Sequence, residues 1–138
     1  MSQKKSPSMD AWLEEAKKDP SAQKCGMYLV HNGTVRASAK AVVRDLIPDE
    51  EKEKMAAVAS LNFSYDAEKV EEAIRQTYEM EGIFYIKVWL NEGILEVGDD
   101  IMYVLIGGDI RPHVVDALQA LVGTIKNTCV VEQEIYAQ

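Results

Sequence analysis

The chain has 138 residues, with 15 basic and 23 acidic side chains, a formal net charge of −8 and a sequence pI near 4.8. This acidic balance argues against general nucleic-acid binding, which requires a basic surface. The longest apolar runs are far too short to cross a bilayer, so we expect no membrane span. The length fits one domain with a single core.

The chain begins with a polar stretch that lacks the apolar segment of a secretory signal peptide. We therefore expect a flexible tail over residues 1–9 and a single domain over residues 10–138. Cys25 and Cys129 lack metal-ligand spacing and lie among apolar residues, which favours buried free thiols in a reducing cytoplasm over a catalytic thiol. His31 and His113 are interpreted as structural, His113 because the dipole of its helix disfavours an imidazolium, and no metal site or cofactor is expected.

Helical and alternating patterns follow one another along the chain in a definite order. A helix runs from Ser8 or Asp10 to Lys18, and a strand covers 26–36, with Asn32-Gly33 as a turn or a bulge. Residues 37–60 form an insert in which a helix starts at 48–51 and continues to Ala59. The remaining predicted elements are a strand at 61–65, a helix at 66–80, strands at 83–90, 94–97 and 100–106, a helix at 112–126 and a strand at 130–136. This order predicts an α+β sandwich with helices packed on a mainly antiparallel sheet.

Three cations stand out as candidate anion-binding groups. Arg111 follows Gly107-Gly108, which would let the backbone turn tightly before a helix, and its planar guanidinium suits a phosphate or a carboxylate. Lys126 lies in the last turn of that helix, where a cation also offsets the helix dipole. Arg36 ends the first predicted strand. Taken singly, each is better explained by a structural role or as a solvated side chain than as a functional group.

The length of the last helix bears on how these cations are used. A straight helix from Arg111 to Lys126 rises by about 22 Å at about 1.5 Å per residue. Side chains that far apart on one chain are unsuited to surround one small substrate. If both serve one pocket, Arg111 must come from a second subunit, so this hypothesis predicts a dimer.

Several segments together resemble a known family. The segments are Gly-Thr-Val-Arg at 33–36, the strand and helix at 61–80, Gly-Ile-Leu-Glu-Val-Gly-Asp at 93–99, Arg111 and Lys126. In this order, from about residue 10 to residue 136, they resemble the large, catalytic subunit of molybdopterin synthase. The resemblance implies an α/β-hammerhead fold, Lys126 as the catalytic residue, and Thr34, Val35, Arg36 and Arg111 as substrate-binding residues.

The resemblance also implies partners and a reaction. The expected assembly is a cytoplasmic homodimer flanked by two small ubiquitin-like sulfur-carrier subunits. Each carrier would insert a C-terminal Gly-Gly thiocarboxylate into a pocket of this chain. Sulfur would pass to a cyclic pyranopterin monophosphate to form the dithiolene that binds molybdenum or tungsten, a step that requires no metal or redox cofactor.

Some positions depart from the family pattern. The family's second lysine, in a Trp-Lys-Lys-Glu segment, has no counterpart in Val-Val-Glu-Gln-Glu at 130–134. Ile110 stands where a histidine precedes Arg111, and Leu90-Asn91 stands where the family has His-Arg. Glu132 or Glu134 would weaken anion binding. A divergent, non-catalytic relative that acts as a dimeric binding or regulatory protein, and an unrelated small-anion-binding domain, therefore stay open as alternatives.

Overall fold

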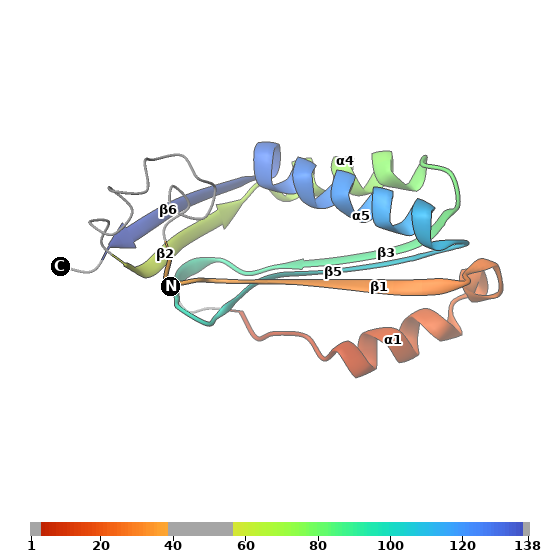
Figure 1. Cartoon of the computed structure of the whole chain (residues 1–138), viewed down its shortest axis with the longest axis horizontal. Coiled ribbons are helices and arrows are strands. Elements are labelled where there is room, and N and C mark those ends of the chain that lie inside the picture. Colours follow the sequence, from red (N-terminus) through yellow and green to blue (C-terminus); the bar gives the residue numbers. More distant parts are fainter. Residues whose placement is uncertain (1–3, 39–56, 137–138) are drawn as a thin grey trace.

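A computed structural model describes residues 4–38 and 57–136 of the chain. Its strands form two antiparallel sheets of three strands each, ordered β1-β5-β3 and β4-β2-β6. In Figure 1, α4 and α5 cover one face of the first sheet and α1 covers the other. The predicted α+β sandwich of helices on antiparallel strands is confirmed. No helix in the described ranges is long and apolar enough to cross a membrane.

The element bounds agree with most of the predicted segments. In chain order the elements are α1 (Met9–Lys18), the 3-10 helix η1 (Pro20–Lys24), β1 (Met27–Thr34), β2 (Val58–Tyr65), α4 (Ala67–Tyr78), β3 (Ile83–Leu90), β4 (Gly93–Glu96), β5 (Asp100–Gly108), α5 (Arg111–Thr124), the π-helical turn η2 (Ile125–Cys129) and β6 (Val130–Tyr136).

Local sequence explains where two of the helices begin. The Ser8 hydroxyl accepts a hydrogen bond from the N–H of Ala11 at the start of α1, and the Asp66 carboxylate accepts two from the first turn of α4. Such side chains satisfy N–H groups that have no partner inside a helix. The predicted helix starts at Ser8 and Asp66 are confirmed.

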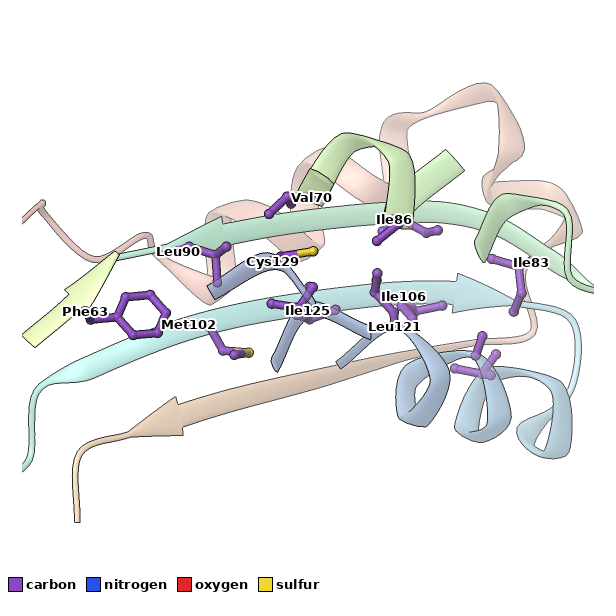
Figure 2. Packing of buried hydrophobic residues seen from close by; sticks show 14 of the residues in the cluster. Phe63, Val70, Ile83, Ile86, Leu90, Met102, Ile106, Leu121, Ile125 and Cys129 are labelled. Atoms are coloured by element: carbon purple, nitrogen blue, oxygen red, sulfur yellow. The ribbon is translucent and has the colours of Figure 1, made fainter. Parts of the chain in front are cut away.

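The central strand β5 is buried on both faces, because helices cover both sides of its sheet. Val104 and Ile106 are fully buried on the α4 and α5 side, and Leu105 is fully buried against Trp12 and Ala16 of α1. A strand covered on both faces is expected to be continuously apolar. Figure 2 shows the larger of the two clusters, where Leu121 and Ile125 pack beside Ile106.

Two local predictions are wrong. The strand β5 continues through Gly107 and Gly108, which therefore do not turn; a Cβ on Gly108 would come within 2.5 Å of the Gly82 carbonyl oxygen. These glycines allow close packing, and residues 109–110 make the turn. Val58 and Ala59, predicted as the end of a helix, lie in β2, where Val58 is buried. The rest of that predicted helix lies outside the described residues.

Residues before α1 contact the region where β3 ends and β5 begins. The Lys4 ammonium donates to the Tyr65 hydroxyl at 2.7 Å, and the Lys4 N–H donates to the Asn91 side chain at 3.1 Å. The Ser6 hydroxyl donates to Asp100 at 2.6 Å. The domain boundary at residue 10 stays a prediction.

Gly82 and Gly98 allow the cost of backbone strain to be separated from the cost of a steric clash. Both have a positive φ, 76° and 94°, and a Cβ on Gly98 would meet nothing within 4 Å. A Cβ on Gly82 would come within 2.5 Å of His113 Nδ1 and disturb its 2.7 Å contact with Asp109. We expect about 1–2 kcal/mol of backbone strain from either substitution by alanine. Urea denaturation should show a larger loss for Gly82→Ala than for Gly98→Ala, and equal losses would contradict the packing argument.

Candidate functional site

A small hollow lies between the end of β1 and the inner face of the β4-β2-β6 sheet. Its volume is about 50 Å³. The residues that line it in the described ranges are Gly33, Thr34, Val35, Arg36, Val58, Leu61, Ile101, Met102, Lys126, Glu132 and Glu134. We call this hollow the Arg36–Lys126 pocket. It accommodates one end group of a ligand, since sites that enclose a whole small molecule typically measure about 300–1,000 Å³.

The end of β1 holds Arg36 in place through its neighbour Val35. The register of β1 on β5 shifts between Gly33 and Thr34, whose partners are Met102 and Asp100, so the residue passed over is Ile101 of β5. The strand β1 runs through Asn32-Gly33, and the predicted alternative of a turn there is wrong. Val35 is 4% exposed, donates its N–H to the Asp99 carbonyl and accepts from the Gly98 N–H. An extra residue of this kind bends the strand pair locally. Arg36 therefore follows an anchored residue at the mouth of the pocket.

Lys126 reaches the same pocket from the π-helical turn that ends α5. Ile125 and Cys129, at the two ends of the turn, are 0% and 4% exposed, whereas Lys126 is exposed between them. The Cys129 carbonyl accepts the N–H of Asp66, which ties the turn to α4. Single π-turns occur frequently at functional sites. The turn fixes the backbone of Lys126 while its ammonium faces the pocket and solvent.

Two carboxylates balance the two cations of the pocket. Glu132 and Glu134 lie opposite Phe63 and Leu61 in the β2–β6 register, on the inner face of the sheet. Both line the Arg36–Lys126 pocket, and both interact with other groups. A pocket with this composition is less favourable for a free anion than one lined by cations alone. The segment that departs from the family pattern, residues 130–134, thus supplies two side chains to the candidate site.

Arg111 lies at the opposite end of α5 and does not line the pocket. Near it, His113 Nδ1 lies 2.7 Å from Asp109 and Nε2 lies 3.6 Å from Glu81. The hydrogen bond with Asp109 raises the pKa of His113, and the same bond lowers the pKa of Asp109. The raised pKa favours an imidazolium at His113, contrary to the expectation from its place at the start of a helix.

The structure thus brings four of the five sequence-predicted site residues together. Thr34, Val35, Arg36 and Lys126 share the pocket, and Arg111 is separated from them by the length of α5. Sequence reasoning missed the apolar walls of the pocket, formed by Val58, Leu61, Ile101 and Met102. The alternation of β2 predicts that Leu61 faces inward. It does not predict that β2 lies next to the end of β1, because the two strands belong to different sheets.

Neither cysteine has the surroundings of a catalytic thiol. Both are free thiols; Cys129 is buried and Cys25 is half-buried. Burial raises the pKa of the Cys25 thiol, which opposes formation of the reactive thiolate. Within residues 4–38 and 57–136, no group of three or more His, Cys, Asp or Glu side chains could hold a metal ion.

Comparison with known families decides the relationship of this chain. The family described as MoaE protein matches residues 3–128, most of the sequence. The chain belongs to the MoaE family. The family match ends just before β6, the strand that carries Glu132 and Glu134. No curated protein sequence matches the chain significantly.

Solved structures with the MoaE fold are similar to this chain at low identity. Molybdopterin synthase from Staphylococcus aureus has a TM-score of 0.65 and 16% identity, covering 84% of this chain and 78% of that one. Molybdopterin cofactor biosynthesis protein E from Burkholderia multivorans has a TM-score of 0.67 and 15% identity, covering 96% and 86%. A complex of subunits 1 and 2 of molybdopterin-converting factor from Helicobacter pylori has a TM-score of 0.60 and 17% identity, covering 94% and 81%. At these identities the likeness shows the fold.

Proposed function

We propose that this chain is the large subunit of a molybdopterin synthase, acting in molybdenum cofactor biosynthesis. Membership of the MoaE family and the likeness to solved structures named for molybdopterin synthesis support this role. The reaction is sulfur transfer from the C-terminal thiocarboxylate of a small carrier protein to a cyclic pyranopterin monophosphate, which forms the dithiolene. The observation that carries the proposal is the meeting of Arg36 and Lys126 in one pocket.

The chemistry of the pocket suits one terminal oxyanion or thiocarboxylate. The Arg36 guanidinium can form two parallel hydrogen bonds with a carboxylate or phosphate group. The Lys126 ammonium can stabilise negative charge that develops on the carrier's carbonyl during transfer, or move a proton to it. Thr34 and Val35 provide the backbone that positions Arg36. The carrier subunit is the expected partner, as supported by the two-subunit complex from Helicobacter pylori.

The position of Arg111 favours a homodimer as the active form. Arg111 and Lys126 lie at opposite ends of α5, and the pocket of one subunit holds only one end group of a ligand. A second subunit that places its own Arg111 over the pocket would add the cation that the substrate phosphate requires. This arrangement also offsets the carboxylates of Glu132 and Glu134, which reduce the affinity of the pocket for anions.

A mixed-subunit experiment tests both the reaction and the dimer. The purified chain is combined with a thiocarboxylated carrier and pyranopterin monophosphate, and the mass of the pterin product is measured. Arg111→Gln and Lys126→Ala subunits are each expected to transfer sulfur far more slowly than the unmodified protein when tested alone. Coexpressed, they are expected to regain activity, because a mixed dimer then contains one pocket with both cations.

Two results would contradict the proposal. Absence of product from the unmodified protein with a competent carrier would refute sulfur transfer by this chain. Failure of the mixed subunits to regain activity would refute the shared pocket while leaving the reaction in place. Mixing two Lys126→Ala preparations is the matched control, since no combination of these subunits restores Lys126.

A further inference from the structure

His31 has a buried nitrogen atom without a partner. It lies on β1 at the same alternating positions as Met27 and Leu29, whose side chains pack against the core beneath α4 and α5. The Nε2 atom of His31 is buried and makes no hydrogen bond to any described residue. Buried polar groups are nearly always hydrogen-bonded, so an exception requires a reason.

The unpartnered nitrogen lies next to the wall of the Arg36–Lys126 pocket. A Cβ built on Gly33 would lie 3.6 Å from His31 Nε2 and 3.3 Å from Cγ of Met102. Gly33 and Met102 both line the pocket. His31 is not itself a lining residue, but its Nε2 lies beside two residues that form the pocket wall, and no side chain on Gly33 stands between them.

The charge of Lys126 acts on the same imidazole. Burial lowers the pKa of His31, and the positive charge of Lys126 lowers it further. On β5, the neighbouring Val104 and Met102 carry no charge, and Arg36, Glu132 and Glu134 are the other charged groups that line the pocket with Lys126. An ordinary histidine has a pKa of about 6.5, and that of His31 is lower, so His31 is neutral at pH 7 in the free protein.

We propose that His31 is a further recognition residue of the pocket, whose buried Nε2 takes up a proton when an oxyanion binds beside Arg36 and Lys126. The oxyanion is a carboxylate or a phosphate group, which offer the same acceptor oxygens. The inference rests on the proposed function, because it takes this pocket as the place where the anionic end of a substrate binds.

The direction of the pH dependence follows from linkage. A bound anion offsets the field of Lys126, and an anion oxygen that lies against the backbone of Gly33 would be an acceptor for the Nε2–H; both effects favour the imidazolium. Binding therefore raises the pKa of His31, and by reciprocity protonation of His31 strengthens binding. Affinity is highest below the His31 pKa of the free protein and falls as pH rises through the pKa of the complex. If binding raises the pKa of His31 by about 1, the protonated protein binds the anion about tenfold more tightly than the neutral protein does.

Nuclear magnetic resonance of the imidazole ring tests this directly. The chain has two histidines, so His113→Gln leaves the His31 signal alone. Sulfate and acetate, which keep their charge from about pH 6 to about pH 8, serve as probes for a phosphate-type and a carboxylate-type ligand. We expect saturation with the recognised anion to move the His31 signals toward imidazolium. We also expect the anion affinity to fall by about threefold or more over this pH range.

Matched variants separate His31 from the rest of the pocket. His31→Phe keeps an aromatic ring without a proton, and it should abolish the pH dependence while the affinity at about pH 8 stays within about twofold of the original. Lys126→Met should raise the pKa of His31 in the free protein, because the nearby charge is removed. Gly33→Ala fills the space beside Nε2 and should reduce the response of His31 to the anion. Circular dichroism confirms that each variant is folded.

The outcomes distinguish this inference from the proposed function. The inference about His31 is overturned if His31 stays neutral in the anion complex, if His31→Phe keeps the pH dependence, or if neither anion binds. Sulfur transfer by a protein whose His31 does not respond would leave the proposed function intact. Uptake of a proton from solvent by His31 when an anion binds, in a protein that fails to transfer sulfur, would refute the function and support the inference.

Discussion

Replacement of Lys126 by alanine is expected to slow sulfur transfer by about 10²- to 10⁴-fold, the range typical for removal of a positioned acid–base group. Lys126 is exposed, and the turn that carries it is held by the buried side chains of Ile125 and Cys129. The substitution therefore removes an amine from the pocket without removing a core contact. The measurement is the rate of pterin product formation with saturating thiocarboxylated carrier.

Lys18→Ala is the matched control for this prediction. Lys18 is a lysine at the end of another helix, 74% exposed and paired with Glu14. A surface pair of this kind contributes little, so transfer is expected to continue at an unchanged rate. A Lys126→Ala protein that transfers sulfur as fast as the Lys18→Ala protein would show that Lys126 has no catalytic role. Equal thermal midpoints for both variants would exclude misfolding as the cause of a lost rate.

Leu121→Ala is expected to cause the largest loss of stability among simple core truncations of α5. Leu121 is fully buried, and Figure 2 shows it within the cluster that joins α5 to the sheet. Truncation of a buried leucine costs about 2–5 kcal/mol, because apolar burial is lost and a cavity remains. That is a large part of the roughly 5–15 kcal/mol by which a domain is usually stable. Chemical denaturation measures the change.

Leu118→Ala provides the comparison on the same helix. Leu118 is only partly buried against the same cluster, so its truncation leaves a site that water can fill, and the loss should be clearly smaller. Equal losses for the two variants would contradict the packing described for α5. Neither leucine lines the Arg36–Lys126 pocket, so the folded fraction of each variant is expected to keep its affinity for anions.

The periodic segments of the chain are well predicted because their patterns are local. The sequence predicts strands at residues 83–90 and 130–136, and these form β3 and β6 with the same bounds. The same periodicity predicts that the last helix reaches Lys126, but α5 ends at Thr124 and continues as a π-helical turn. Helical periodicity cannot distinguish these two forms over one turn, because both keep Ile125 on the buried side.

Glycine is harder to interpret from sequence. The sequence pattern predicts a turn at Gly107 and Gly108, yet the structure uses their lack of a side chain inside β5, beside the Tyr28 ring and the Gly82 carbonyl. The reason is that glycine permits both unusual backbone angles and close packing. Only knowledge of the neighbouring segments separates the two uses.

The sequence by itself determined the family, the order of helices and strands, and the cations available for chemistry. Its apolar periodicity is a local property, and the distance from Arg111 to Lys126 follows from the rise of a helix. Only the tertiary structure decided which charges meet. The register shift after Gly33, the turn after α5 and the register of β6 on β2 bring Arg36, Lys126, Glu132 and Glu134 to one pocket. Arg36 lies far from the other three in the sequence, and their meeting depends on strand pairing and packing that no local pattern encodes.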